Sequence, residues 1–238
     1  MSNFVWNTQL NHKLAKEIKK KYPKCKVIFG GLGNPNKNRL GNFLEENDYI
    51  DIVVNGEGEL TFEHILVESL KDEPNYKNVE GISTRDFITN DRQRIKDIDS
   101  MPSPYLDGLF NKIIDGSSAV FESTIESVRG CPYQCTFCEI GDKYFQKISR
   151  QSNEKVFAEL DWISKNKIRL VYNADSNFGL LPEHIDIAKH ISNLKNKTGY
   201  PEMMNLDWAK SKADKVVELA RILTKSKLLK GITIALQS

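Results

Sequence analysis

Features of several protein classes are missing from this 238-residue sequence. No uninterrupted apolar run is long enough to cross a bilayer, and the N-terminus lacks the basic-then-apolar order of a signal peptide, so we expect no membrane partner. The formal net charge is only +2, which does not indicate a nucleic-acid-binding protein. We therefore expect a globular protein of the cytoplasm, where thiols stay reduced.

Cysteine is scarce as well, and its placement is uneven. Cys131, Cys135 and Cys138 fall within eight residues, whereas Cys25 lies more than a hundred residues upstream. Spacings of three and two intervening residues allow one loop to wrap three soft thiolates around a single centre, which suits iron-sulfur or zinc ligation. Such a centre would lack one protein ligand.

No histidine is placed to complete this loop. None lies between His64 and His184, and the remaining two, His12 and His190, also fall in predicted helices away from the loop. A structural zinc site normally has four Cys or His ligands, so zinc would need a distant residue. A disulfide plus a free thiol is a second alternative. We favour a cluster with one open iron, and we predict that Cys25 is a structural thiol.

The spacing Cys131-x3-Cys135-x2-Cys138, with the aromatic Phe137 before the last cysteine, resembles the signature of the radical S-adenosylmethionine superfamily. The apolar residues 119–121 are predicted to form the strand that leads into the loop. The resemblance implies that the thiolates hold a four-iron, four-sulfur cluster, with S-adenosylmethionine on the open iron and Phe137 beside this cofactor. It also implies reductive cleavage of the sulfonium to methionine and a 5'-deoxyadenosyl radical, chemistry that the cofactor carries.

Residues 1–80 are predicted to form an alternating α/β unit. The predicted elements are a helix over 8–22, a strand over 26–29, a helix over 39–46, a strand over 50–54, and a helix with Phe62, Ile65, Leu66 and Leu70 on one face. This alternation predicts parallel strands that receive ligands at their C-terminal ends. Glycine-rich turns follow both strands, one with Gly30 and Gly31, the other with Gly56 and Glu57.

This order of segments, beginning with Phe-Val-Trp-Asn at residues 4–7, resembles the later half of a Rossmann-like cobalamin-binding domain. That domain precedes the radical barrel in one large subclass of the superfamily. In those relatives the glycine turns pass close to the corrin or its nucleotide tail, which implies the same role for Gly30, Gly31, Gly56 and Glu57. The family's early Asp-x-His-x-x-Gly segment has no counterpart here. Two parallel strands do not form a covered sheet alone, so we expect a fragment that lacks the start of this domain.

Residues 81–110 are predicted to be a connector, with a hairpin formed by residues 82–87 and 92–98. Residues 111–238 are predicted to be the first part of an incomplete (β/α) radical barrel. Its predicted elements are strands over 119–121, 168–173, 203–208 and 231–237, and helices over 154–166, from about 182 onward, and over 213–226. Because the alternation stops at a fourth strand, we expect the end of the barrel to be missing.

Polar residues follow the predicted barrel strands, where functional residues of such barrels gather. In the family, the end of the second strand binds the amino group of S-adenosylmethionine, and Asp175 and Asn177 occupy that place. Capping of a helix by these Asp and Asn side chains is the alternative. Polar groups at the fourth strand's end hold the ribose in relatives, which implies this role for Gln237 and Ser238. Lys210 is a weaker candidate, with an exposed lysine as the alternative.

Our leading interpretation is an α/β radical S-adenosylmethionine enzyme of the cobalamin-binding subclass. It is expected to transfer a methyl group or rearrange a carbon skeleton, and the isolated fragment is expected to be inactive. The expected partners are a small-molecule substrate and an electron donor such as a flavodoxin or ferredoxin. An iron-sulfur protein of electron transfer or redox sensing and a zinc-stabilised binding module stay open as alternatives.

Overall fold

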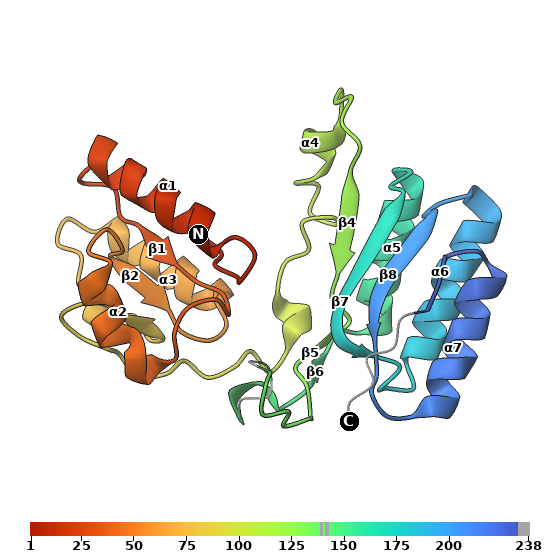
Figure 1. The fold of residues 1–238 in the computed structure, drawn as a ribbon. Helices are drawn as coiled ribbons and strands as arrows, with labels where there is room; N and C mark the ends of the chain where they lie inside the picture. Colours follow the sequence, from red (N-terminus) through yellow and green to blue (C-terminus); the bar gives the residue numbers. More distant parts are fainter. Residues whose placement is uncertain (139, 141–142, 233–238) are drawn as a thin grey trace. The chain divides into compact units, whose positions relative to one another are not determined.

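The computed structural model describes residues 1–138, 140 and 143–232. The chain divides into two compact units, Met1–Ile95 and Lys96–Ser238 (Figure 1). The predicted connector over residues 81–110 is shared between the two units, and the predicted domain limits stay predictions. In the described part of the chain, no helix combines the length and the hydrophobicity needed to cross a bilayer.

The first unit is built on a three-stranded sheet with the order β1-β2-β3. Its elements are α1 (Thr8–Lys21), β1 (Ile28–Phe29), α2 (Leu40–Glu46), β2 (Ile52–Val54), α3 (Glu59–Ser69) and β3 (Ile82–Ser83). β1 and β2 are parallel, as predicted, and Ile28 is paired with Ile52. Their C-terminal ends therefore lie at the same edge of the sheet.

The predicted hairpin between residues 82–87 and 92–98 is wrong. Ser83 forms an antiparallel bridge with Ile88 rather than with residues 92–98, and β3 also pairs antiparallel with β2, where Val54 is the partner of Ile82. The backbone N–H of Thr84 donates to the carbonyl of Phe87 over 2.9 Å, which closes a tight turn earlier than predicted. Pairing with β2 buries Ile82 completely. An isolated two-stranded hairpin, by contrast, is at best marginally stable in water.

The predicted apolar face of α3 is also wrong. Of the four predicted core side chains, only Ile65 is buried, while Phe62, Leu66 and Leu70 are exposed. Thr61 and Glu68 are buried beside Ile65, because both find hydrogen-bond partners. The Arg92 guanidinium donates to the Thr61 hydroxyl, and the Lys71 ammonium and the Asn75 N–H donate to the Glu68 carboxylate.

The second unit holds three parallel strands in the order β4-β7-β8. Its main elements are α4 (Asn111–Ile114), β4 (Glu122–Ile125), β5 (Val128–Arg129), β6 (Ser149–Arg150), α5 (Asn153–Lys165), β7 (Leu170–Phe178), α6 (His184–Thr198), β8 (Met203–Trp208) and α7 (Ala213–Lys225). Helices α5, α6 and α7 lie side by side along one face of the sheet (Figure 1). The core between the layers includes Ile125, Val171 and Met204 from the strands and Leu160, Ile191 and Leu219 from the helices.

Two strand boundaries in this unit differ from the prediction. The strand before the cysteine loop begins at Glu122 rather than at residue 119, and Val120 is exposed. β7 runs on to Phe178, five residues past its predicted end at Asn173, with an irregular register against β8 between Asn173 and Phe178. Asp175 and Asn177 thus belong to a strand, not to the loop after it. Most of the predicted fourth strand, residues 233–237, lies outside the described residues.

Candidate functional site

The cysteine loop is closed at its base by a short antiparallel pair. β5 and β6 pair antiparallel, with Arg129 opposite Ser149, so the two ends of the cysteine loop lie next to each other. Directly after β5, the Cys131 N–H donates to the carbonyl of Phe145 over 2.9 Å, and the Cys138 N–H donates to the carbonyl of Cys135 over 3.0 Å. These backbone bonds hold the cysteines within one compact loop.

All four cysteines are free thiols, so the disulfide alternative is not formed in this structure. Cys131 is buried, whereas Cys138 and the distant Cys25 are exposed. Phe137 beside the last cysteine is 79% exposed. Within the described residues, no three His, Cys, Asp or Glu side chains converge on a metal position. The loop thus supplies a donor set of three thiols whose side chains are not gathered around one point.

Asp175 anchors the segment that leads into this loop. Its Oδ1 accepts the backbone N–H groups of Ser127 over 2.7 Å and of Val128 over 2.9 Å, and its Oδ2 accepts the Ser127 hydroxyl. The Asp175 side chain is fully buried, with 1% of the residue exposed. Both carboxylate oxygens are therefore used to hold the turn at Ser127 and Val128, a structural role that differs from the helix capping given as the alternative. The predicted contact with a bound amino group stays a prediction.

His184 is a fully buried residue that lies against Asp175, and the sequence pattern predicts no role for it. Its Nδ1 accepts the Gly179 N–H over 2.6 Å, so the neutral ring carries its proton on Nε2. This Nε2 faces Asp175 Oδ2 at 3.4 Å, and the ring stacks on Phe178. These partners all lie at the end of β7 and in the turn that follows, five to nine residues upstream.

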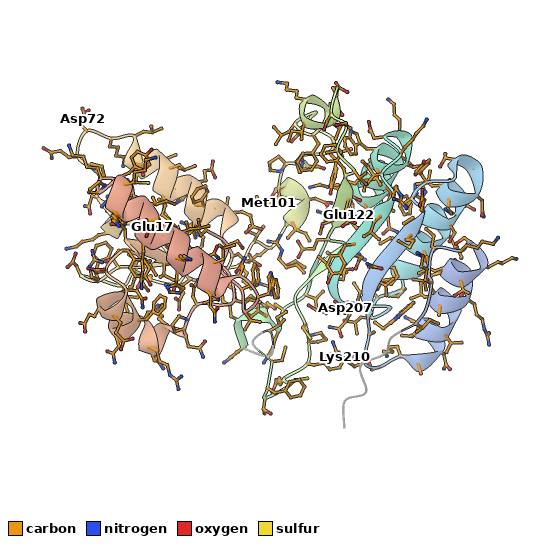
Figure 2. The ribbon with its side chains drawn as sticks, turned by 45° about the horizontal axis from the view of Figure 1, so that its top comes forward. Glu17, Asp72, Met101, Glu122, Asp207 and Lys210 are labelled. Atoms are coloured by element: carbon orange, nitrogen blue, oxygen red, sulfur yellow. The ribbon has the colours of Figure 1, made fainter. Side chains whose placement is uncertain are left out.

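Asn177, near the end of β7, contacts the cysteine loop, and Lys210, just after β8, contacts Asn177. The Asn177 Nδ2 amide donates to Cys131 Sγ over 3.1 Å. Lys210, just beyond β8 (Figure 2), donates to the Ser176 carbonyl over 3.2 Å and to Asn177 Oδ1 over 3.4 Å. The weak candidate Lys210 thus contacts the stronger candidate Asn177. Parallel strands place these residues at one edge.

A further contact ties the loop to the same edge. The Tyr133 hydroxyl, two residues after Cys131, forms a hydrogen bond with the Ser211 hydroxyl in the segment after β8. The cysteine loop is therefore held by all three parallel strands or by the segments that follow them. Phe137 has no contact of this kind among the described hydrogen bonds. Gln237 and Ser238 lie outside the described residues.

The glycine turns of the first unit lie at the C-terminal ends of β1 and β2. Gly31 has a φ of +92°, and a Cβ there would lie 2.6 Å from the Asn3 carbonyl oxygen. The Gly30 carbonyl accepts the Asn3 N–H over 2.6 Å. Gly31 is therefore needed for close approach of the chain's own N-terminal segment. Gly56, in the second turn, has a φ of +74°, which favours glycine.

Glu57 is engaged within the first unit. Its Oε1 accepts the Arg94 Nε–H over 2.9 Å, and its Oε2 accepts the Ile95 N–H over 2.7 Å. The Glu57 side chain is 8% exposed. This carboxylate holds the end of the unit against the turn after β2. Contacts of Gly30, Gly31, Gly56 and Glu57 with a cofactor stay predictions.

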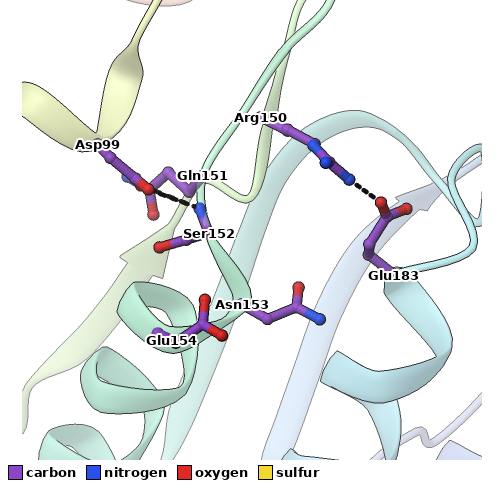
Figure 3. Close-up of a pocket in the computed structure, with 7 residues that line it drawn as sticks. All are labelled: Asp99, Arg150, Gln151, Ser152, Asn153, Glu154 and Glu183. Carbon is purple, nitrogen blue, oxygen red and sulfur yellow. Dashed lines mark hydrogen bonds and ion pairs between the residues drawn. The ribbon is translucent and has the colours of Figure 1, made fainter.

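A polar cavity of about 390 Å³ lies where α5 begins (Figure 3). Asp99 accepts the Ser152 N–H through both carboxylate oxygens at 3.0 Å, which satisfies a free donor at the helix start. Arg150 and Glu183 form an ion pair across the cavity. Asp99, Arg150 and Glu183 are thus engaged with one another or with the helix start, and we assign the cavity no ligand.

No model of a protein family matches the chain. The cobalamin-dependent radical SAM methyltransferase TokK of Streptomyces tokunonensis is 31% identical over 249 aligned residues, which cover all of this chain and 36% of TokK. The 2-(S-pantetheinyl)-carbapenam-3-carboxylate methyltransferase of Streptantibioticus cattleyicolor is 32% identical, with the same coverage. The chain thus spans little more than a third of the length of these curated relatives.

Two solved structures share the fold. OxsB, a cobalamin-dependent S-adenosylmethionine radical enzyme with aqua-cobalamin and S-adenosylmethionine bound, matches with a TM-score of 0.60 and 22% identity, over 95% of this chain and 33% of OxsB. The radical S-adenosylmethionine methyltransferase TsrM of Kitasatospora setae, with cobalamin and a [4Fe-4S] cluster bound, matches with a TM-score of 0.60 and 13% identity, over 94% of this chain and 52% of TsrM. Both matches extend across the two units.

Proposed function

Because the chain belongs to the cobalamin-binding subclass of the radical S-adenosylmethionine superfamily, we propose that it acts in methyl transfer with an iron-sulfur cluster, S-adenosylmethionine and cobalamin. The observation that carries the proposal is the match of this whole chain to about a third of two methyltransferases, at 31% and 32% identity. Neither alternative from the sequence, electron transfer or a zinc module, accounts for a match that covers both units.

Cys131, Cys135 and Cys138 are the proposed cluster ligands. Their fit is chemical, because three free thiols on one closed loop are the soft donors that iron-sulfur clusters take. The buried amide donor on Cys131 also suits a sulfur that carries negative charge. When bound, the cluster supplies the electron that cleaves the sulfonium of S-adenosylmethionine, and the protein supplies binding and orientation.

We place S-adenosylmethionine at the edge formed by the ends of β7 and β8. Asn177 and Lys210 are the polar groups described there. Phe137 is exposed and free to pack on a ligand held by the loop. The sequence resemblance adds Asp175, Gln237 and Ser238 to this proposal. With Asp175 engaged by the turn, its contribution is to position the loop rather than to touch the cofactor.

We place cobalamin at the edge of the first unit's sheet where β1 and β2 end. Support comes from the parallel register of these strands, which brings the turns of Gly30 and Gly56 to one edge. The residues proposed to line this edge are Gly30, Gly31, Gly56 and, through its hold on the turn, Glu57. A small-molecule substrate and an electron donor such as a flavodoxin or ferredoxin complete the proposal.

Anaerobic reconstitution of the chain with iron, sulfide and hydroxocobalamin tests the proposal. About four irons and four sulfides per chain, retention of cobalt on gel filtration, and a change in the electron paramagnetic resonance spectrum of the reduced cluster on adding S-adenosylmethionine would each support the proposal. Stoichiometric zinc without iron would instead support the binding module. A cluster whose spectrum ignores S-adenosylmethionine would support electron transfer.

A further inference from the structure

We propose that Asn177, oriented by Lys210, is a positioning residue that raises the reduction potential of a cluster held through Cys131. The inference rests on the proposed function, since it assumes that the cysteine loop binds the cluster. It adds a specific electrostatic role for two residues outside the cysteine motif. Its basis is the set of contacts that Asn177 makes on both sides of its side-chain amide.

The first contact is the hydrogen bond from Asn177 Nδ2 to Cys131 Sγ, which measures 3.1 Å. Asn177 is 4% exposed and Cys131 is 8% exposed, so water does not compete with this bond. In such surroundings a dipole acts on a nearby charge more strongly than it would in water. The amide donor thus faces a sulfur that would carry negative charge as a cluster-ligating thiolate.

The second contact fixes which end of the amide faces the sulfur. A lysine ammonium can only donate hydrogen bonds, and Lys210 Nζ lies 3.4 Å from Asn177 Oδ1. The oxygen therefore points to Lys210, and the NH₂ group points to Cys131. The Ser176 carbonyl accepts a second bond from Lys210 at 3.2 Å, which keeps the ammonium in place. The positive charge of Lys210 also polarises the amide and strengthens its donor end.

The backbone holds this arrangement in register. Asp175, two residues before Asn177 on β7, binds the backbone of Ser127 and Val128, which begin the approach to Cys131. The distance between the strand carrying Asn177 and the loop carrying Cys131 is therefore set by buried hydrogen bonds. The amide-to-sulfur contact does not depend on a freely rotating surface side chain.

Hydrogen bonds to the sulfurs of an iron-sulfur cluster are among the factors that set its potential. A donor at Cys131 stabilises the reduced cluster more than the oxidised one, because reduction adds negative charge. Asn177 and Lys210 should therefore make the cluster easier to reduce. This matters for a reaction that starts with transfer of one electron to a sulfonium.

The test compares the midpoint potential of the reconstituted cluster, without S-adenosylmethionine, in the parent and in three variants. Asn177→Asp replaces the donor by an oxygen that only accepts and carries charge. Lys210→Met removes the orienting charge but keeps an aliphatic stem. Lys212→Met removes the same charge from an exposed side chain two residues away and serves as the control.

We expect Asn177→Asp to lower the reduced-to-oxidised ratio at a fixed potential by about tenfold, which corresponds to about 59 mV for one electron. Lys210→Met should shift the potential in the same direction by a smaller amount, and Lys212→Met should not shift it. If Asn177→Asp does not bind a cluster, the midpoint potential of Lys210→Met decides the test, because that substitution leaves every buried residue unchanged.

Three outcomes would count against the inference. If the parent and both variants share one potential while binding of S-adenosylmethionine weakens, Asn177 acts on the cofactor and not on the sulfur. If Lys212→Met shifts the potential as much as Lys210→Met, only net charge matters. A parent that takes up no iron and sulfide overturns the proposed function and this inference together, whereas an intact cluster with an unchanged potential overturns the inference alone.

Discussion

The Asp175 carboxylate accepts both the backbone N–H and the hydroxyl of Ser127, although 48 residues separate the two in sequence. This pair joins the middle of the sheet to the turn that begins the cysteine loop. A buried carboxylate is tolerated only when its oxygens are hydrogen-bonded, and here the backbone of the turn provides the donors. The stability of the unit and the placement of its cysteines are thus coupled at one residue.

Asp175→Asn should reduce the free energy of unfolding by about 1 to 3 kcal/mol, because one oxygen becomes a donor that faces the donors of Ser127 and Val128. Urea denaturation followed by tryptophan fluorescence would measure the change. Asp161→Asn is the matched control, since Asp161 also faces a histidine, His190, but is 57% exposed. Equal effects of the two substitutions would contradict the anchoring role.

Alanine at Cys131, Cys135 or Cys138 should abolish the intact cluster, whereas Cys25→Ala should leave it in place. Only the three loop thiols share one segment closed by backbone bonds, and Cys25 is exposed in the other unit. Iron and sulfide analysis after anaerobic reconstitution checks this expectation. Loss of iron in Cys25→Ala as complete as in Cys135→Ala would show that the three-ligand site is wrong.

Gly179→Ala should destabilise the second unit by more than about 1 kcal/mol. Gly179 has a φ of +101°, and a Cβ would lie 3.1 Å from Leu219 Cδ1 and 3.3 Å from Val216 Cγ2. Gly116→Ala is the control, because Gly116 shares a positive φ but has open space around it. Thermal unfolding of both variants separates backbone strain from crowding. A melting temperature equal in the two variants would rule out the crowding contribution.

Glu159→Gln should raise the free energy of unfolding at pH 7. Burial raises the pKa of the Glu159 carboxyl above its ordinary value of 4.5, and the Ser103 hydroxyl and the Lys155 ammonium nearby offset this only in part. The folded state then binds more protons than the unfolded state, so the parent loses stability as the pH rises above 4.5 through the raised pKa. The gain in the free energy of unfolding of Glu159→Gln over the parent should therefore become smaller as the pH falls towards 4.5 and below.

Denaturation curves of Glu159→Gln between pH 4 and pH 8 would measure this dependence. Glu154→Gln, which removes the same charge from an exposed position of the same helix, is the control. We expect its difference in the free energy of unfolding from the parent to change less with pH, because an exposed carboxylate is solvated in both the folded and the unfolded state. The burial argument would be contradicted if the difference in the free energy of unfolding between Glu159→Gln and the parent did not change with pH.

The sequence by itself determined the helices with clear apolar periodicity and the position of the cysteine loop. The helix predicted over residues 8–22 is α1 (Thr8–Lys21), and those predicted over 154–166 and 213–226 are α5 and α7 to within a residue. Such patterns are readable because a helix pairs residues only three or four positions apart. The cysteine spacing is likewise local, and the family it indicated is the one found by comparison.

Only the tertiary structure decided which polar side chains are buried and what they do. Asp175 and Asn177 take their hydrogen-bond partners from segments 46 to 48 residues away, and no local pattern encodes such pairing. The same reason explains the wrong face of α3, where Glu68 is buried because Lys71 and the backbone of Asn75 satisfy it. Burial of a polar group depends on partners that only the folded chain assembles, because an unpaired group would stay in water.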